Sequence, residues 1–357
     1  MKKILTIVGA RPQFIKAAAI ERVIADNYSE DIHEDLLHTG QHYDDTMSAC
    51  FFRELQLPQP RYNLSVGSGT HGAQTAAMIK GIEEVILSEH YDGVLVYGDT
   101  NSTLAGAIAA AKQKMPVYHV EAGLRSFDRA MPEEVNRVLT DHASTLLFAP
   151  TKTAVQNLKN EGFKNSQIVF SGDVMLDNMK HYSTYADWRW KDGKNYMLAT
   201  VHRDFNTDNP ERLKSILAAL CDLGEKYRCD IVFPVHPRTR QRIAAMKDIV
   251  LSERVCMVEP LSYFETIGAL QKAMVVLTDS GGLQKEAYFT KAPCVVLRPE
   301  TEWIEIVKAG AAILADADHD KIMNAVAELC HADFLPSDEF GDGHAAHKII
   351  EAILKTA

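Results

Sequence analysis

The 357-residue chain has few of the features of secreted, membrane-spanning or nucleic-acid-binding proteins. Its six cysteines are scattered without a CxxC pair, which is typical of reduced cysteines used as small core residues. No apolar run approaches the roughly 20 residues of a membrane span, and the basic start MKKILTIV leads into a charged loop, unlike a signal peptide. The net charge of −10 argues against a nucleic-acid surface. We therefore expect a cytoplasmic protein with neither a membrane nor a nucleic-acid partner.

Two common nucleotide-binding motifs are also missing. The segment VGARPQFIKAA lacks the second and third glycines of GxGxxG, and GxxxxGK[ST] occurs nowhere, which disfavours a nicotinamide or ATP enzyme. His38 and His42 lie four residues apart, but no further ligand has a matching spacing. We expect neither a metal nor another cofactor.

Short apolar runs alternate with longer amphipathic ones along the whole chain. The runs are rich in Val, Ile and Leu without polar alternation, as in strands buried on both faces of a parallel sheet. The pattern pauses between residues 171 and 195, which predicts an α/β fold of two Rossmann-like domains, 1–170 and 171–340, facing a cleft. The strands are predicted at 4–8, 35–38, 93–98, 116–120, 144–150, 167–172, 196–201, 230–235, 254–260, 274–280, 292–297 and 311–315.

Ionisable residues follow seven of these predicted strands. In open α/β sheets ligands bind beyond the carboxyl ends of the strands, so these groups predict a shared polar site. Carboxylates come from Asp99, Glu121 and, on the next helix, Glu133 or Glu134. The cationic candidates are Arg11, Lys16, Arg125, His202, Arg203, Arg238 and Arg298.

The segment LTDSGGLQKEA, residues 277–287, predicts a strand end, two glycines and a helix. Backbone N–H groups of Ser280, Gly281 and Gly282 would be free to bind a phosphate or diphosphate, because a Cβ there would block its approach. Glu286, one turn further on, suits the hydroxyls of a ribose.

Each of these features has a structural alternative. A Gly-Gly turn is often only a tight connection, Arg11 and Lys16 could be surface charges, and an acid-rich first helical turn is common. His202 could lie in an ordinary loop. These alternatives would have to hold at seven strand ends together, which favours a binding site for a polyanion.

Nine short motifs carry a family resemblance over nearly the whole chain. Together they closely resemble the non-hydrolysing UDP-N-acetylglucosamine 2-epimerases, which implies the two-domain fold of GT-B glycosyltransferases. In that fold the final helix, within 341–357, crosses back to the first domain. The motifs are GARPQFIK, HTGQH, YGDTNST, HVEAGLRS, MPEEVNR, VHR, HPRT, TDSGGLQKEA and RPETEW.

The resemblance implies a reversible inversion at C2 of a UDP-bound N-acetyl sugar. Because the C2 hydrogen is not beside a carbonyl, its direct removal would give an unstabilised carbanion. The family eliminates UDP in anti geometry to give a 2-acetamidoglucal, and then adds UDP and a proton back on the other face of C2. This chemistry needs a base, an acid and cations around the departing diphosphate.

The resemblance also implies roles for individual residues. Asp99, Glu121 and Glu133 match the catalytic carboxylates, without showing which is base and which acid, and His202 matches a histidine near the diphosphate. In some bacterial members, the loop matching Gln41 and His42 binds a second, activating substrate molecule. The residues predicted to bind UDP, by this match or by their place at strand ends, are Arg11, Lys16, Arg137, His202, Arg203, His236, Ser280, Gly281, Gly282, Glu286 and Arg298.

Three departures from the family's usual motifs bear on the substrate. Gln13 replaces a glutamate, HRDFN replaces HRREN, and Trp303 with Ile304 changes TERPE to TEWIE. These variants resemble the subgroup acting on UDP-2,3-diacetamido-2,3-dideoxyglucuronate, a precursor of surface polysaccharides. The loss of an acidic group at Gln13 fits the extra sugar carboxylate. We predict this substrate, with UDP-N-acetylglucosamine as the alternative.

Two further functions share UDP-sugar binding. A GT-B glycosyltransferase would transfer the sugar to an acceptor, and a nucleotide-sugar sensor would bind without reaction. Neither would incorporate solvent deuterium at C2, whereas an epimerase must. Since relatives are often dimers, we expect a homodimer whose domains close around the glycal, with hinges near 171–194 and at the final crossover.

Overall fold

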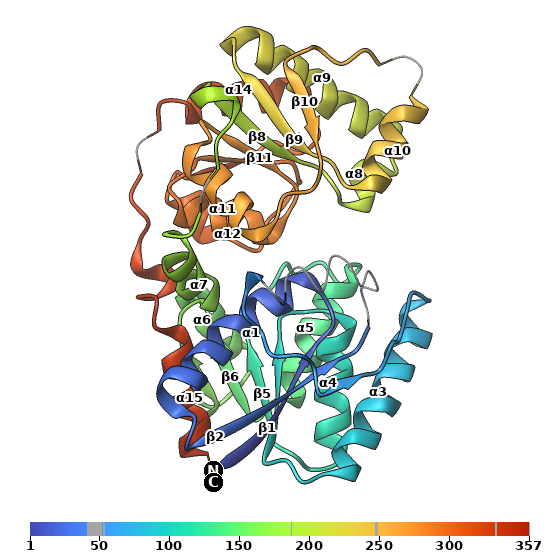
Figure 1. The fold of residues 1–357 in the computed structure, drawn as a ribbon, viewed down its shortest axis with the longest axis vertical. Helices are drawn as coiled ribbons and strands as arrows, with labels where there is room; N and C mark the ends of the chain where they lie inside the picture. Colours follow the sequence, from blue (N-terminus) through green and yellow to red (C-terminus); the bar gives the residue numbers. More distant parts are fainter. Residues whose placement is uncertain (41–51, 53, 187, 247–248, 333, 357) are drawn as a thin grey trace. The chain divides into compact units, whose positions relative to one another are not determined.

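The computed structural model describes residues 1–40, 52, 54–186, 188–246, 249–332 and 334–356. The chain forms two compact units (Figure 1). Unit 1 is Met1–Lys180 with Asp338–Ala357, and unit 2 is His181–Ser337. The chain therefore passes between the units twice, near residue 180 rather than 170 and near 337 rather than 340.

Unit 1 is built on a parallel sheet in the order β3-β2-β1-β4-β5-β6-β7. Its strands are β1 (Lys2–Val8), β2 (Ile32–His38), β3 (Tyr62–Asn63), β4 (Gly93–Tyr97), β5 (Val117–Val120), β6 (Leu146–Ala149) and β7 (Ile168–Phe170). Its α-helices are α1 (Arg11–Val23), α3 (His71–Ser88), α4 (Asn101–Lys112), α5 (Pro132–Ala143), α6 (Lys152–Asn160), α7 (Val174–Tyr182, which ends at the boundary of unit 2) and α15 (Ala345–Lys355).

Unit 2 is built on a second parallel sheet, in the order β10-β9-β8-β11-β12-β13. Its strands are β8 (Tyr196–Thr200), β9 (Asp230–Pro234), β10 (Val255–Val258), β11 (Val276–Thr278), β12 (Cys294–Val296) and β13 (Ala312–Leu314). Its helices are α8 (Asp204–Thr207), α9 (Pro210–Tyr227), α10 (Pro237–Ala245), α11 (Tyr263–Lys272), α12 (Gly281–Phe289), α13 (Ile304–Lys308) and α14 (His319–Leu329).

All twelve predicted strands are present, so the α/β prediction is confirmed. The two-residue strand β3 was missed because so short an edge strand has no apolar pattern of its own. Helix α7 was missed in the segment interpreted as a pause. Its Asp177 accepts hydrogen bonds from the backbone N–H of Ala345 and Ala346, at 3.1 and 2.8 Å. These bonds hold most of α7 in unit 1 and place the boundary near its C-terminal end.

The strand order reverses at one place in each sheet. In unit 1, β1 lies between β2 and β4, and in unit 2, β8 lies between β9 and β11. At such a switch point the connections leave in opposite directions and open a crevice beyond the carboxyl ends of the strands. The loops after β1 and β4, and those after β8 and β11, are therefore where each unit is expected to bind ligands.

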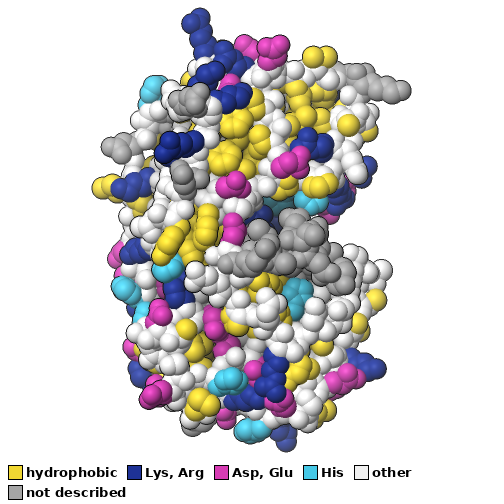
Figure 2. Space-filling model, in the orientation of Figure 1, with side chains coloured by type: hydrophobic (Ala, Val, Ile, Leu, Met, Phe, Trp, Pro, Cys, Tyr) yellow, Lys and Arg dark blue, Asp and Glu magenta, His cyan; other side chains and the backbone are white. Residues whose placement is uncertain are grey.

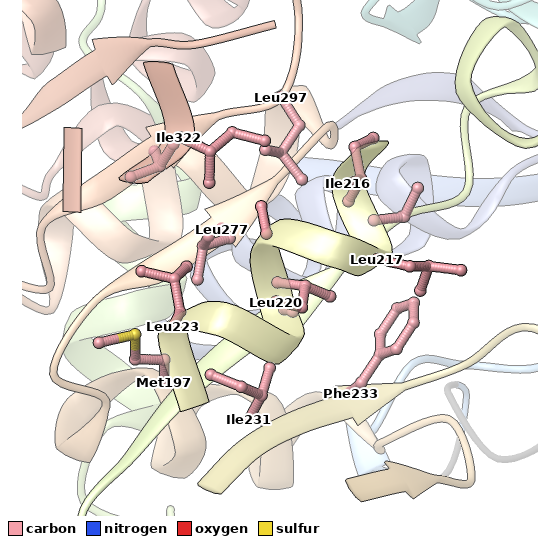
Figure 3. Close-up of a cluster of buried hydrophobic side chains, with 14 of the residues drawn as sticks. Met197, Ile216, Leu217, Leu220, Leu223, Ile231, Phe233, Leu277, Leu297 and Ile322 are labelled. Atoms are coloured by element: carbon pink, nitrogen blue, oxygen red, sulfur yellow. The ribbon is translucent and has the colours of Figure 1, made fainter. Parts of the chain in front are cut away.

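The core of unit 2 lies between its sheet and helices α9 and α14. Figure 3 shows side chains of α9 such as Leu220 and Leu223 against those of the strands, such as Ile231 and Leu277. All four are fully buried. Burying one such side chain stabilises the fold by about 1.5–3 kcal/mol, so this packing fixes the ends of the strands.

The C-terminal helix α15 packs in unit 1 beside α1, as the resemblance implied (Figure 1). Its apolar side chains Ile349, Ile350 and Ile353 are buried. The Nζ of Lys2 donates a hydrogen bond to the carbonyl oxygen of Ile353 at 3.1 Å, which ties the helix to the first strand.

Other composition-based expectations concern the surface and the cysteines. Of the five described cysteines all are free thiols, and Cys229 and Cys294 are buried. Within the described ranges no helix is long and apolar enough to cross a membrane. On the face drawn in Figure 2, basic and acidic side chains are interspersed, without a continuous basic band among the coloured residues.

Candidate active site

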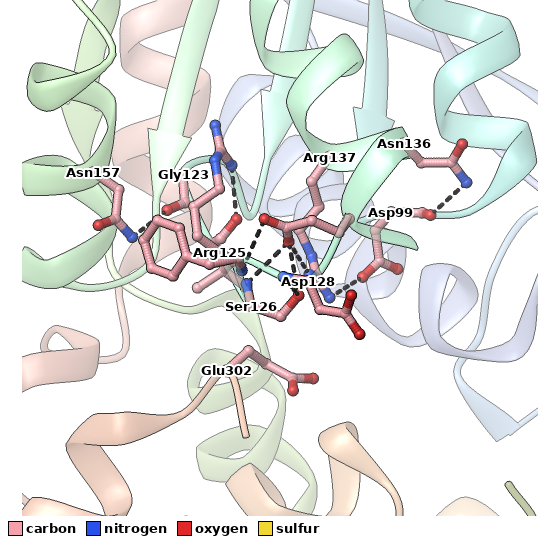
Figure 4. A network of polar contacts seen from close by, with 12 residues as sticks. Asp99, Gly123, Arg125, Ser126, Asp128, Asn136, Arg137, Asn157 and Glu302 are labelled. Atoms are coloured by element: carbon pink, nitrogen blue, oxygen red, sulfur yellow. Dashed lines mark hydrogen bonds and ion pairs between the residues drawn. The ribbon is translucent and has the colours of Figure 1, made fainter. Parts of the chain in front are cut away.

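In unit 1 an arginine joins two of the candidate carboxylates. The guanidinium of Arg137, on α5, forms ion pairs with Asp99 at 2.7 Å and with Glu134 at 2.8 Å (Figure 4). Asp99 follows β4, and its carbonyl oxygen accepts a hydrogen bond from Asn136 at 2.9 Å. The Asp99 side chain keeps 31% of its surface exposed, whereas Arg137 and Glu134 are buried. Asp99 is thus held in place while remaining accessible.

The two adjacent glutamates of α5 have different environments. Glu134 is buried, and it accepts hydrogen bonds from the backbone N–H of Ser126 at 2.9 Å and of Phe127 at 3.1 Å. It therefore fixes the loop before α5 and has little capacity left for a ligand. Glu133 is only half-buried. Of the two glutamates, Glu133 is thus the more accessible to a ligand.

Glu121, at the end of β5, forms an ion pair with Lys16 of α1. Both side chains are about nine-tenths buried. The pair lies against Gly98, where an added Cβ would lie 3.1 Å from Lys16 Nζ and 3.2 Å from a Glu121 oxygen. Gly98 has φ +66° and Glu121 has φ +73°, values rare for a residue with a side chain. Glycine adopts such a φ without strain, so the strain lies at Glu121, and backbone strain of this kind clusters at functional sites.

A buried ionic network lies beneath these turns. His119 contacts Asp141, and Arg125 forms ion pairs with Asp141 at 2.7 Å and Glu161 at 2.6 Å. Burial alone would raise the pKa of Asp141, but the hydrogen bond and charge of His119 and the charge of Arg125 hold that pKa below its ordinary value. The prediction that Arg125 takes part in anion binding is wrong, because its guanidinium is almost fully buried among its carboxylate partners.

Gln13 does not contact a ligand site either. Its side-chain oxygen accepts hydrogen bonds from the N–H of Gly9 and Ala10, at 2.8 and 3.1 Å, and its amide donates to Tyr97 and Thr103, both at 2.9 Å. The side chain is buried and fully engaged within the protein. The interpretation that Gln13 adapts the loop to a sugar carboxylate is therefore wrong. Its role is to order the turn that carries Arg11.

In unit 2 a buried carboxylate that the sequence interpretation left without a role orients the loop after β8. Asp279, at the end of β11, accepts hydrogen bonds from the backbone N–H of His202 at 3.1 Å and of Arg203 at 3.0 Å. It also lies 3.2 Å from Nδ1 of His202, whose side chain is 46% exposed. Asn206 donates to the same carboxylate at 3.1 Å. The sequence signal was the TDSGG motif, where Asp279 directly precedes the predicted anion-binding turn.

Helix α12 begins as predicted, but its first residues differ in what they contact. The N–H of Ser280 donates to Thr278 Oγ1 at 3.0 Å, so the prediction that it is free to bind a phosphate is wrong. A Cβ on Gly281 would lie 2.5 Å from a carboxylate oxygen of Glu302. A Cβ on Gly282 would meet no protein atom within 4 Å. First-turn amides have no acceptor within their own helix, so Gly281 and Gly282 keep the geometry of an anion site.

The other predicted residues of this site lie in buried surroundings. Glu286 is 6% exposed on α12. Arg298, after β12, is also buried, and its guanidinium lies 3.0 Å from Glu302. Trp303 is buried under the ammonium of Lys285, 4.2 Å from the ring centroid. Of these residues, Glu302 and Trp303 lie next to Gly281 at the N-terminus of α12.

The remaining predicted residues are His236, Arg238, Gln41 and His42. His236 is exposed, and its ring accepts from the N–H of Arg238 at 3.3 Å. Arg238 forms ion pairs with two aspartates of α8 and the residue after it, which leaves it less available to an anion. Gln41 and His42 fall outside the described residues. Within the part of the chain that the structure describes, no group of three His, Cys, Asp or Glu side chains could hold a metal ion.

Comparison with known proteins gives matches along the whole chain. A family described as UDP-N-acetylglucosamine 2-epimerase matches residues 26–354. A UDP-N-acetylglucosamine 2-epimerase homolog of Methanococcus maripaludis is 49% identical over 362 residues, which are 98% of this chain and 99% of the relative. The UDP-2,3-diacetamido-2,3-dideoxy-D-glucuronate 2-epimerase of Pseudomonas aeruginosa is 46% identical over 360 residues, 99% of each chain. The crystal structure of Methanocaldococcus jannaschii UDP-GlcNAc 2-epimerase in complex with UDP-GlcNAc and UDP has a TM-score of 0.91 at 40% identity, over 100% of both chains.

Proposed function

The chain belongs to the UDP-N-acetylglucosamine 2-epimerase family, and we propose that it inverts C2 of a UDP-N-acetyl sugar by eliminating and re-adding UDP. Its fold is the GT-B type with two Rossmann-like units, as the resemblance implied. Family membership makes the enzyme an isomerase and disfavours the glycosyltransferase and the sensor.

The observation that carries the proposal is the placement of carboxylates and cations at the switch point of unit 1. Asp99 and Glu121 follow adjacent strands, and each is held by a cation, Arg137 and Lys16 respectively. Glu133 lies half-buried at the start of the next helix. The reaction needs groups that remove a proton from C2 and return one on the opposite face, and general acid–base catalysis by positioned carboxylates supplies about 10²–10⁴-fold.

The departing UDP needs positive charge and N–H donors. Unit 2 offers the half-exposed His202 and the first turn of α12, and unit 1 offers Arg11 at the start of α1. A negative charge that grows on the diphosphate as the C1–O bond breaks is stabilised by such preorganised groups. We assign UDP binding to these residues, with Glu286 holding the ribose.

For the sugar we propose UDP-2,3-diacetamido-2,3-dideoxyglucuronate. The proposal is supported by the 46% identity with the Pseudomonas aeruginosa enzyme and by the Trp303–Ile304 replacement next to the α12 turn. UDP-N-acetylglucosamine is the second candidate, favoured by the 49% identity with the Methanococcus maripaludis homolog.

Proton NMR of the reaction in D₂O tests activity and substrate together. The full-length protein is incubated separately with the two UDP-sugars, and the C2 signal of each is followed. We expect C2 deuteration and conversion to the C2 epimer, faster with the diacetamido substrate. Deuteration of UDP-N-acetylglucosamine alone would make that sugar the substrate instead. No deuteration of either sugar would overturn the epimerase proposal. The Asp99→Asn variant serves as the inactive control.

A further inference from the structure

The buried side chain of His119 contacts two groups that accept hydrogen bonds. Its Nδ1 lies 2.7 Å from Asp141, and its Nε2 lies 2.8 Å from the carbonyl oxygen of Gly98. A carbonyl oxygen cannot donate. Asp141 is an acceptor too, because its other oxygen already receives the N–H of Gly123 and the guanidinium of Arg125. A neutral imidazole has a single N–H, so both contacts are hydrogen bonds only if both ring nitrogens carry hydrogen.

The charges around His119 balance such an imidazolium. Asp141 comes from α5, Arg125 from the loop after β5, and Glu161 from the residue after α6. With His119 they form an alternating row of two cations and two anions. His119 and Asp141 have no exposed side-chain surface. A buried charge is tolerated when it is paired and hydrogen-bonded in this way.

His119 also connects the segments that carry the candidate carboxylates. One ring nitrogen reaches the turn after β4, directly before Asp99. The other reaches α5, the helix that begins with the Glu133 turn. The strand of His119 ends at Val120, and Glu121 follows it directly. Glu121 has φ +73°, which is strained for a residue with a side chain and needs surrounding contacts to persist.

We propose that His119 is a positioning residue that acts as a buried imidazolium and sets the mutual geometry of Asp99, Glu121 and Glu133. Its effect on turnover rests on the proposed function, whereas its protonation does not. His119 touches no substrate and moves no proton. It holds the Gly98 carbonyl, and with it the Asp99 turn, against α5. A misplacement of about 1 Å in such a group costs about 10²-fold in rate.

Nitrogen NMR of the folded protein tests the protonation directly. Protein labelled with ¹⁵N-histidine is measured at about pH 8, where an exposed histidine is neutral. The His119 ring is assigned from the His119→Gln spectrum or, if that variant does not fold, from through-space contacts to Gly98. We expect hydrogen on both ring nitrogens. A ring with one bare nitrogen overturns the proposal.

Two variants each keep one of the two hydrogen bonds of His119 and remove the other. His119→Gln keeps an N–H near the position of Nε2 and can still bind the Gly98 carbonyl, whereas His119→Asn keeps only the N–H near Nδ1, toward Asp141. Because each variant breaks one of the two contacts that join the Gly98 turn to α5, we expect each to lower kcat about 100-fold with UDP affinity unchanged. His331→Gln, at an exposed position of unit 2, is the matched control and should leave kcat unchanged.

The outcomes are distinct. Wild-type kcat in both variants would overturn the positioning role, and a loss of UDP affinity as large as the loss of kcat would indicate a general structural role and overturn it too. If neither variant folds, the spectrum of the wild-type protein still decides the protonation. If the wild-type protein lacks epimerase activity but His119 carries both hydrogens, the proposed function fails and the imidazolium stands.

Discussion

The candidate carboxylates Asp99 and Glu121 of unit 1 are paired with cations, whereas part of the candidate site of unit 2 is open to solvent. In unit 1, Asp99 and Glu121 each form an ion pair with a cation. In unit 2, His202 is half-exposed, and the space beside Gly282 is empty of protein atoms. Groups that react must already be in position, while groups that bind a nucleotide must be accessible to it. This difference supports the proposal that the carboxylates of unit 1 react, and that groups of unit 2, with Arg11, bind UDP.

The largest expected effect comes from removing a reacting carboxylate of unit 1. Asp99→Asn, Glu121→Gln and Glu133→Gln should each lower kcat by about 10²–10⁴-fold, because one proton transfer loses its acid or base. UDP affinity, measured by calorimetry, should stay near the wild-type value. Glu134→Gln is the matched comparison. Its main effect should be on thermal stability, because Glu134 fixes the loop before α5. Wild-type turnover in all three variants would contradict the assignment of the proton transfers to these carboxylates of unit 1.

The second effect concerns the buried network of unit 1 and depends on pH. Because the pKa of Asp141 is lowered in the folded protein, its stabilising contribution is present above about pH 4 and is lost as the pH falls through the folded value. Asp141→Asn leaves buried positive charge unpaired and should lower the free energy of unfolding by about 3–5 kcal/mol at neutral pH. Urea unfolding at pH 7 and near pH 3.5 measures this, with a smaller difference expected at the lower pH. Asp320→Asn, at an exposed position, is the control. If Asp141→Asn lowered the free energy of unfolding equally at both pH values, the prediction would be contradicted.

The third effect concerns UDP affinity. His202→Ala and Arg11→Ala should each raise the dissociation constant of UDP about 10–100-fold, the loss expected for a hydrogen bond to a charged group of about 1.5–3 kcal/mol. Lys214→Ala removes an exposed positive charge on α9 and should leave the affinity unchanged. If both variants bind UDP as tightly as the wild type, the assignment of the diphosphate to these residues is wrong.

The smallest effect separates the two glycines of α12. Gly282→Ala adds a methyl group that touches no protein atom, so stability should not fall, and it should even rise by about 0.5–1 kcal/mol because alanine favours a helix. A diphosphate at this turn would meet that methyl group, and UDP affinity should fall about 10-fold. Gly281→Ala should instead lower the melting temperature, since its Cβ would collide with Glu302. Unchanged UDP binding by Gly282→Ala would place the anion elsewhere.

Much of the fold could be predicted from the sequence because it depends on local patterns. Buried parallel strands have continuous apolar runs, and the residues after them mark the ligand edge of each sheet. The roles that could not be predicted depend on partners far away along the chain. Gln13 binds Tyr97 and Thr103, and Arg125 binds Asp141 and Glu161. No local pattern distinguishes a polar residue that serves a ligand from one that serves a distant turn.

Asp279 illustrates the same limit from the other direction. The sequence placed it at a strand end beside the glycines, yet its function of orienting the His202 loop depends on the pairing of β8 with β11. The strand order is not contained in the apolar pattern. Once that order is known, the two loops at the switch point must be neighbours, and a carboxylate in one can order the other.

The placement of α15 against α1 and β1 has a consequence for protein synthesis. The strands and helices of unit 2 form one uninterrupted stretch of the chain, whereas unit 1 needs a segment translated after all of them. Until α15 leaves the ribosome, the apolar side of α1 that it covers stays exposed to water. Unit 2 can therefore complete its fold first, which reverses the usual N-terminal-first order. Until then the uncovered apolar surface of unit 1 makes the nascent chain prone to aggregation.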